Sequence, residues 1–259
     1  MLRKKKSVVI LVLVLLVSTI VGCTQQESSS NVEEFVIGLD DTFAPMSFRN
    51  EQNEIVGFDV DLAKEVAKRN GWNIRFQPID WAMKEAELNS GNIDMIWNGY
   101  TITDERKEKV NFTDAYLTNS QIIVTLSDSD IDEIDDLKNK TVATQAESSS
   151  LDAARKLDGF IESLKDGKII EYSTFNEVFN DLESGRTDAI IVDEVLARYY
   201  MNNKGEGLYK VLDENLGIEE YGVGVRKEDE ELLKKLNITL EEMKNDGTYD
   251  EIYSMWFAE

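Results

Sequence analysis

Groups that bind a carboxylate occur together in residues 94–106, which read DMIWNGYTITDER. Arg106 supplies a planar guanidinium with paired donors, Thr101 supplies a hydroxyl, and the backbone around Gly99 supplies amide groups. The first five residues of the segment are typical of a short strand, and Thr103 is a helix cap. We therefore expect Arg106 in the first helical turn beyond the carboxyl end of a strand, where open α/β sheets bind ligands. For an arginine considered alone, a surface salt bridge is the more common role.

A second segment repeats the pattern that leads to this arginine. The pattern Leu-x-Ser-Gly-x-x-Asp-x-Ile occurs in residues 88–96 and again in residues 182–190. It predicts two related α/β units, each of which contributes a helix, a tight turn and a strand to one cleft. The first strand leads to Arg106 and the second ends at Asp193, so one unit offers a cation and the other an anion. This arrangement suits a zwitterionic α-amino acid, whose two ion pairs would be desolvated and strengthened by closure of the cleft.

Apolar periodicity and turn residues predict the elements that position these groups. We expect strands at residues 35–39, 74–78, 94–98, 120–126, 140–144, 169–172, 208–212 and 222–225, and one that ends at Asp193. We expect helices at residues 58–67, 83–88, 151–157, 175–182, 228–245 and 247–256, and one that begins at Thr103. Residues 110–116 and 127–136 are expected as loops. The second loop has aspartates at alternate positions, but Glu133 stands where a calcium loop needs glycine, so we expect no metal site.

Two further features lie at predicted element ends. The serines at residues 148–150 precede a helix, so that hydroxyls and free amides again meet at a helix start. Trp81 follows the strand at residues 74–78. Local packing of Trp81 and stacking on a ligand side chain both stay open.

The first 33 residues differ in composition from the rest of the chain. Residues 3–6 are basic and residues 8–17 are apolar, a run too short to span a bilayer, which predicts a secretory signal peptide at residues 1–22. Cys23 is the only cysteine, which excludes an intramolecular disulfide. Because it follows Ile-Val-Gly, the segment resembles the lipobox of bacterial lipoproteins, which implies lipidation of Cys23 and a tether to a membrane. Residues 23–33 are then expected as the lipidated cysteine and a polar, flexible tether.

Composition limits the remaining function classes. The chain of 259 residues is 42% hydrophobic, enough for one large or two small globular domains with a core. Loss of residues 1–22 would remove four basic residues and change the net charge from −23 to −27, which argues against nucleic acid or anionic lipid as a partner. The absence of histidine excludes Ser-His-Asp and Cys-His catalysis, and no carboxylate pair is marked out by spacing. We therefore expect a binding protein without a cofactor rather than an enzyme.

Six motifs distributed along the chain match one family. They are D-x-x-F-A-P-M from Asp40, G-F-D-x-D-L from Gly57, T-I-T-D-E-R from Thr101, D-L-K-x-K-x-V from Asp136, S-G-R-x-D-A from Ser184 and G-T-Y from Gly247. In these motifs, and over residues 34–257, the chain resembles the extracytoplasmic solute-binding proteins of polar amino acid ABC transporters (solute-binding protein family 3). That family includes the lysine/arginine/ornithine, histidine and glutamine binders.

The resemblance implies an α/β fold of the periplasmic-binding-protein type II, with two lobes joined by a two-strand hinge and a ligand cleft between them. The implied boundaries are residues 34–120 and 221–259 for the first lobe and residues 121–220 for the second. The chain would cross between the lobes near residues 120–124 and 218–224.

The resemblance also implies a set of ligand-binding residues from both lobes. Arg106, helped by Thr101 and the Ser148-Ser149 turn, would hold the ligand carboxylate. Asp193 and Gly99 would hold the ammonium. Asp40 would meet the distal polar group, and Phe43 and Trp81 would enclose the aliphatic part. The remaining expected ligand contacts are Asn98, Tyr100 and Ala146.

The resemblance implies a class of ligand and a set of protein partners. Asp40 favours a basic amino acid, with an added contribution from Glu147, which stands where this family usually has glycine. Glutamine or cystine remains an alternative, because Asp40 can also accept a hydrogen bond from an amide. A catalytic or sensory member of the same fold is the other alternative. The expected partners are the ABC permease and, through it, the ATPase, and the protein is expected to be a monomer on the outer side of the cell membrane.

Overall fold

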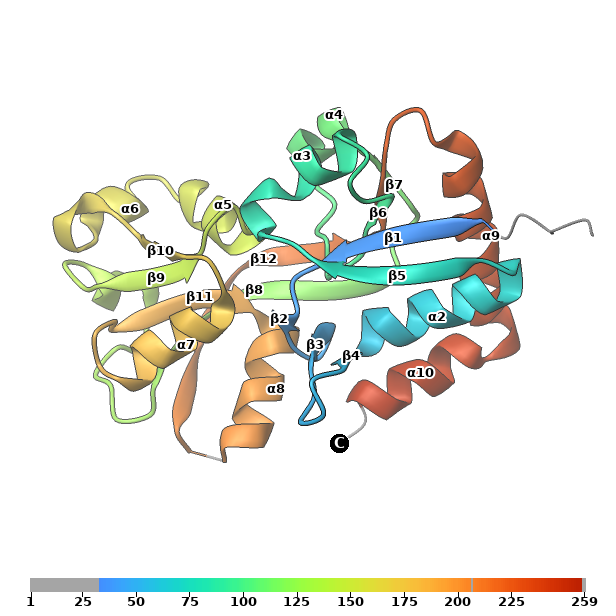
Figure 1. The fold of residues 1–259 in the computed structure, drawn as a ribbon. Coiled ribbons are helices and arrows are strands. Elements are labelled where there is room, and N and C mark those ends of the chain that lie inside the picture. The colour runs from blue at the N-terminus through green and yellow to red at the C-terminus, as the bar shows by residue number, and fades with distance from the viewer. Residues whose placement is uncertain (1–32, 206, 258–259) are drawn as a thin grey trace, which may run out of the picture. The chain divides into compact units, whose positions relative to one another are not determined.

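The computed structural model describes residues 33–205 and 207–257, which belong to one compact unit (Figure 1). The predicted signal peptide, Cys23 and the tether up to residue 32 lie outside the described residues. Among the helices that are described, none combines the length and apolar character needed to cross a membrane.

The first of two five-stranded sheets has the strand order β5-β1-β6-β13-β7. Its strands are β1 (Glu34–Leu39), β5 (Asn73–Pro78), β6 (Met95–Ile96), β7 (Asn111–Phe112) and β13 (Gly224–Val225). β1 pairs in parallel with β5 and β6, whereas β13 runs antiparallel to β6 and β7. A strand from the end of the chain therefore completes a sheet that begins at residue 34.

Helices and a small antiparallel sheet accompany this first sheet. The helices are α2 (Phe58–Asn70), α3 (Lys84–Asn89), α4 (Asp104–Lys109), α9 (Glu230–Asp246) and α10 (Thr248–Phe257), and the 3-10 helix η1 spans Trp81–Met83. The small sheet contains β2 (Thr42–Phe43), β3 (Ser47–Arg49) and β4 (Ile55–Val56). α2 buries its apolar face and ends at Gly71, whose φ of 69° is left-handed, as expected for a helix C-cap. We call these elements and the first sheet together the first lobe.

The second five-stranded sheet has the order β10-β9-β11-β8-β12. Its strands are β8 (Leu117–Leu126), β9 (Val142–Gln145), β10 (Ile170–Tyr172), β11 (Ala189–Asp193) and β12 (Tyr209–Tyr221). Its helices are α5 (Ser149–Arg155), α6 (Phe160–Ser163), α7 (Phe175–Glu183) and α8 (Glu194–Lys204), with the 3-10 helices η2 (Ile134–Leu137) and η3 (Lys165–Gly167). We call these elements the second lobe.

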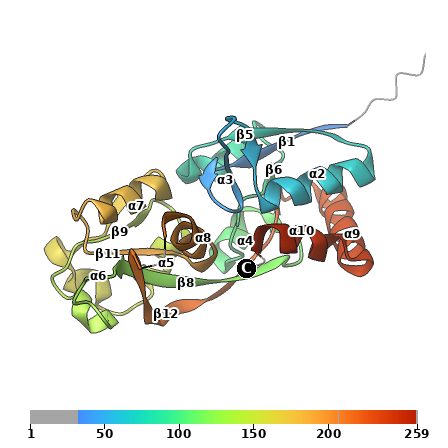
Figure 2. The ribbon, with the colours of Figure 1, turned by 90° about the horizontal axis from the view of Figure 1, so that it is seen from below.

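The two long strands of the second sheet connect the lobes. β8 and β12 are antiparallel neighbours, and Leu117 at the start of β8 pairs with Tyr221 at the end of β12. At the same end, Thr101 of the first lobe forms a β-bridge with Tyr221. Figure 2 shows β8 extending from the helices of the second lobe toward α9 and α10 of the first. This arrangement confirms the predicted two-lobe α/β fold.

The sequence repeat corresponds to a structural repeat. In both copies a helix ends at a serine and the following glycine has a positive φ, 78° for Gly91 and 70° for Gly185. The aspartate of the first copy, Asp94, accepts the backbone N–H of Val36 at 2.8 Å. The aspartate of the second copy, Asp188, accepts a backbone N–H in the same way at 2.7 Å. Each motif therefore ends a helix and ties the next strand to its sheet neighbour.

Several predicted elements differ from those observed. β6 covers two residues instead of the five expected at residues 94–98, and the expected loop at residues 110–116 contains β7. The short strand predicted at residues 208–212 is part of the 13-residue β12. Residues 213–215 of β12 are exposed and polar, and its register with β8 shifts twice, so apolar alternation did not mark its length. α8 was not predicted, because only two of its residues, Leu196 and Ala197, are buried.

Candidate ligand-binding site between the two lobes

Arg106 lies in the first turn of α4, as the sequence predicted. The hydroxyl of Thr103 caps the helix by accepting the Arg106 N–H at 3.1 Å. The Arg106 guanidinium donates to the carbonyl oxygen of Thr101 at 3.0 Å and, across the cleft, to that of Glu147 at 3.4 Å. It also lies over the ring of Tyr100, 4.8 Å from the ring centre, and only 4% of the residue is exposed. The side chain is thus buried and fixed rather than engaged in a surface salt bridge.

Asp193 stands at the carboxyl end of β11 and is also buried. Its Oδ1 accepts hydrogen bonds from Asn119 at 2.9 Å, Gln121 at 2.8 Å and the Tyr221 hydroxyl at 2.6 Å. Burial raises the pKa of the Asp193 carboxyl well above its ordinary value, and the nearby carboxylate of Glu219 raises it further. A positive group next to Asp193 would relieve both effects.

Asp40 follows β1 and forms a third polar corner of the site. Its Oδ1 accepts the backbone N–H and the hydroxyl of Thr42, at 2.9 and 2.6 Å. Its Oδ2 accepts the side-chain amide of Gln145 from the second lobe at 2.7 Å. Its backbone N–H donates to Oδ1 of Asn98 at 2.6 Å. Burial raises the pKa of Asp40 even though the hydrogen bonds from Thr42 and Gln145 lower it.

Aromatic side chains form the apolar part of the site. Phe43 and Phe175, which come from different lobes, lie with their ring centres 5.7 Å apart. Trp81 packs edge-on against Tyr100, with ring centres 5.8 Å apart, and it also lines the cavity described below. The local packing of Trp81 is therefore confirmed, and its position on the cavity wall is compatible with the predicted stacking on a ligand side chain.

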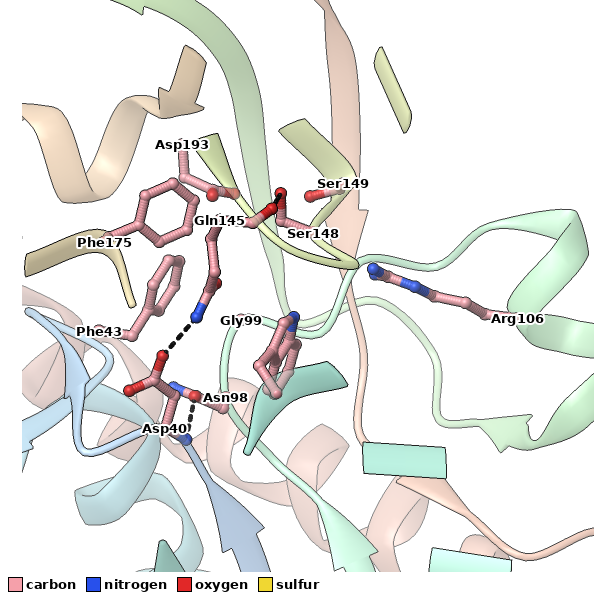
Figure 3. A pocket seen from close by; sticks show the side chains of 11 residues that line it. Asp40, Phe43, Asn98, Gly99, Arg106, Gln145, Ser148, Ser149, Phe175 and Asp193 are labelled. Atoms are coloured by element: carbon pink, nitrogen blue, oxygen red, sulfur yellow. Dashed lines mark hydrogen bonds between the residues drawn. The ribbon is translucent and has the colours of Figure 1, made fainter. Parts of the chain in front are cut away.

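These groups line one cavity of about 10 Å³ (Figure 3). In Figure 3, Arg106 reaches in from one side, while Asp40, Phe43, Phe175 and Asp193 lie on the opposite side. A cavity of this volume has room for about one water molecule. The residues that line the cavity are Asp40, Phe43, Trp81, Asn98, Gly99, Arg106, Gln145, Ser148, Ser149, Phe175 and Asp193.

Three predicted contact residues do not line this cavity. Tyr100 is fully buried, where its ring supports Arg106 and its hydroxyl donates to Glu85 at 2.8 Å. Thr101 directs its hydroxyl to Ser149 at 3.0 Å and only its carbonyl contacts the guanidinium. The backbone N–H of Ala146 donates to the carbonyl of Tyr172, which lies in the same lobe.

The backbone at Gly99 also differs from expectation. Its amide is not free, because it donates to Oδ2 of Asp59 at 2.7 Å. Gly99 has a φ of 51°, and a Cβ at this position would lie 2.7 Å from the ring of Phe43. Glycine is therefore required both by the backbone conformation and by the close approach of the ring. The Gly99 amide cannot act on a ligand, and only its carbonyl is left for that purpose.

Sequence reasoning missed two lining residues, Gln145 and Phe175. Gln145 is the last residue of β9, the same carboxyl-end position that drew attention to Asp193. Phe175 is the first residue of α7, directly after its cap Thr174. A position at the end of a strand or the start of a helix could therefore have identified Gln145 and Phe175 as lining residues. Phe175 also belongs to the hydrophobic core.

The site fits a small polar solute better than a metal ion. No group of three or more potential metal ligands occurs among residues 33–205 and 207–257. Two α/β lobes that enclose a small cavity with charges of both signs define a two-lobe binding protein.

Comparisons with known proteins place the chain in a family. The model for bacterial extracellular solute-binding proteins, family 3, matches residues 35–259. A probable histidine-binding protein of Neisseria gonorrhoeae is 32% identical over 83% of this chain and 80% of its own length. The arginine-binding extracellular protein ArtP of Bacillus subtilis is 31% identical over 93% of this chain and 92% of its own. The crystal structure of an ABC uptake transporter substrate-binding protein from Streptococcus pneumoniae with bound histidine has a TM-score of 0.84 and 41% identity, covering 87% of this chain and 93% of that one.

The chain belongs to the bacterial extracellular solute-binding proteins of family 3. It is a solute-binding protein and not an enzyme, in agreement with the expectation from its sequence.

Proposed function

We propose that this protein captures a free basic L-amino acid outside the cell and delivers it to the permease of an ABC importer. The observation that carries the proposal is the pair Arg106 and Asp193, two buried side chains of opposite charge on the wall of one cavity. A zwitterion has the two complementary charges, with its carboxylate at Arg106 and its ammonium at Asp193. Ser148 and Ser149, at the start of α5, line the same cavity and would support the carboxylate end.

The preference for a basic side chain rests on Asp40. This buried carboxyl is a third charged group on the cavity wall, and its raised pKa shows that burial disfavours its ionised form. A cationic side chain compensates that charge, whereas a neutral one offers only a hydrogen bond. Glutamine or cystine is the second candidate, because Gln145 shows that an amide group fits against Asp40.

The relatives support the same ligand class. Those compared above are described as binding histidine or arginine, and the arginine-binding relative matches over 93% of this chain. Arg106, Asp193 and Asp40 together give the cavity the groups that either amino acid would use.

The cellular arrangement is part of the proposal. Lipid on Cys23 would hold the protein on the outer face of the membrane, and residues 24–33 would let it reach the permease as a monomer. The lobes would meet at residues 120–121 and 220–221, close to the ends of β8 and β12. Substitution of Cys23 by alanine is expected to release the protein from the membrane fraction, as detected by blotting of fractionated cells.

A thermal-shift screen of residues 24–259 tests the ligand class. The screen would contain the twenty amino acids with ornithine, citrulline and cystine, because a ligand that binds only the folded state raises the melting temperature. The largest rise is expected from arginine, lysine or histidine. A largest rise from glutamine or cystine would favour the second candidate. No rise from any of them would refute amino acid binding.

A further inference from the structure

Lys84 is a buried cation outside the group of residues assigned to the ligand. It is the first residue of α3, directly after η1, and only 2% of it is exposed. Its ammonium donates to the carbonyl of Trp81 at 3.2 Å and lies 5.1 Å from the centre of that ring. The nearest carboxylate is that of Glu85 at 3.6 Å. Fully buried lysines are rare unless they are paired, so the position of Lys84 calls for an explanation.

The third contact of Lys84 crosses the cleft. Its Nζ donates to the carbonyl oxygen of Glu147, in the second lobe, at 3.0 Å. Arg106 donates to the same oxygen at 3.4 Å. Glu147 is held in the left-handed region, with a φ of 53°, a conformation uncommon for a residue other than glycine. Two cations of the first lobe thus converge on one carbonyl of the second.

This carbonyl belongs to the turn that carries the expected carboxylate-binding groups. Ser148 follows Glu147 directly and is the N-cap of α5, and Ser149 is the first helical residue. Both serines line the cavity together with Arg106. A group that fixes the Glu147 carbonyl therefore also fixes the direction of the Ser148 and Ser149 backbone.

The charges around Lys84 favour the binding of an added anion. Burial, and to a smaller extent the positive charge of Arg106, lower the pKa of Lys84 to about 8 against the opposing effects of Glu85 and Glu147. The two cations therefore disfavour each other in the protein alone. A carboxylate placed at Arg106 would attract both at short range in a poorly solvated site.

We propose that Lys84 is the second cation of the carboxylate subsite and a determinant of specificity for ligands that carry an α-carboxylate. The inference rests on the proposed amino acid binding. Lys84 acts through charge and through the Glu147 carbonyl, and it does not touch the cavity itself. It strengthens carboxylate binding only when the two lobes are in contact, because its partner lies across the cleft.

The test compares ligands that differ by the carboxylate alone. The affinities of L-arginine and agmatine, and of L-histidine and histamine, would be measured by calorimetry for the wild type, Lys84→Met and Lys84→Arg. Lys107→Met is a matched control, since Lys107 lies on α4 near Arg106 with an exposed side chain. Circular dichroism and melting temperature would confirm that each variant is folded.

The expected result is a change in discrimination rather than a uniform loss of binding. Lys84→Met is expected to reduce the preference for the amino acid over its decarboxylated form by about tenfold, and Lys84→Arg and Lys107→Met by less than about threefold. If Lys84 had only a structural role, Lys84→Met would weaken binding of the amino acid and of its decarboxylated form equally. Equal weakening, or an unchanged preference in Lys84→Met, overturns the inference. If no amino acid binds the wild type, the proposed function fails first and the inference falls with it.

Discussion

The side-chain amide of Gln145 in the second lobe donates from Nε2 to Oδ2 of Asp40 in the first lobe, at 2.7 Å. The same amide donates to the carbonyl of Ser173 at 2.9 Å, which holds it in place. A ligand side chain that reaches Asp40 must therefore share this carboxylate with Gln145 or displace the amide. Asp40 and Gln145 together are the pair that we expect to determine which side chain is accepted.

Asp40→Asn tests the preference for a basic ligand. The substitution keeps the shape of the side chain and removes its charge, so a cationic ligand side chain loses its counter-charge. We expect the affinity for arginine to fall by at least about 30-fold, because a buried charge left unpaired costs roughly 2 kcal/mol or more. The affinity for glutamine should change less than about threefold. Calorimetric titration with both amino acids measures this, and equal losses for both would contradict the role of Asp40.

Arg106→Met tests the carboxylate subsite. The variant keeps an unbranched apolar side chain and removes the guanidinium, together with its contact with the Tyr100 ring, so we expect at least about a 100-fold loss of amino acid affinity. Lys107→Met changes the same charge on an exposed neighbouring residue and should leave affinity within about twofold. Binding by Arg106→Met at wild-type strength would show that the carboxylate is held elsewhere.

The raised pKa of Asp193 next to Glu219 predicts that ligand binding depends on pH. Burial and Glu219 raise the pKa of Asp193, whereas a ligand ammonium favours its ionised form, so binding should release a proton. Affinity is then expected to be highest above the raised pKa and to fall as the pH decreases through it. Calorimetric titration from the ordinary aspartate pKa of about 4 upward in pH, in buffers of different ionisation enthalpy, measures both effects.

Glu219→Gln separates the two causes in that prediction. It keeps an acceptor for Asn119 and Gln121 but removes the neighbouring negative charge. The fall in affinity should therefore move to lower pH. Glu220→Gln, at the adjacent exposed position, should leave the profile unchanged. A profile that is the same in all three proteins would exclude an effect of Glu219 on Asp193.

The buried carboxyl of Asp59 predicts that the unfolding free energy, rather than ligand binding, depends on pH. Burial raises the pKa of this carboxyl to about 7, although the hydrogen bonds from Gly99 and Tyr116 lower it. A raised folded-state pKa gives stability that is fully present below the ordinary value of 3.8 and is lost as the pH rises through 7. As the pH rises from 3.8 to about 7, the wild type should lose up to about 1.4 kcal/mol of unfolding free energy per pH unit for this group, and above pH 7 this loss should stop.

Asp59→Asn removes that titration and should flatten the stability curve between pH 3.8 and about 7, the ordinary and the folded-state pKa of Asp59. Urea unfolding at each pH measures the difference. Asp61→Asn is the control, because Asp61 lies on the same helix with a partly exposed side chain. Parallel curves for the wild type and Asp59→Asn would exclude titration of Asp59 in this range.

Much of the fold could be predicted from local patterns. The face of α2, the Thr103 cap and the repeated serine-glycine turns each have a short-range physical cause, and each occurs as expected. The length of β12 could not be predicted, because its outer residues are polar and its pairing depends on β8, far away in sequence.

The site was predictable where a charged residue follows a strand, as for Arg106 and Asp193. It was less predictable where the decisive fact is a contact across the cleft. Neither the bond from Gln145 to Asp40 nor that from Lys84 to Glu147 follows from local sequence, because each joins residues more than sixty positions apart. The use of the Gly99 amide by Asp59 is hidden for the same reason.

The most direct test of the central claim is a calorimetric comparison of L-arginine, agmatine and 5-guanidinopentanoate on the wild-type protein. Agmatine lacks the carboxylate that Arg106 would bind, and 5-guanidinopentanoate lacks the ammonium that Asp193 would bind. If both charges of a zwitterion are held between the lobes, L-arginine binds and each analogue binds at least about 100-fold more weakly. Binding of both analogues as tightly as L-arginine would contradict the account.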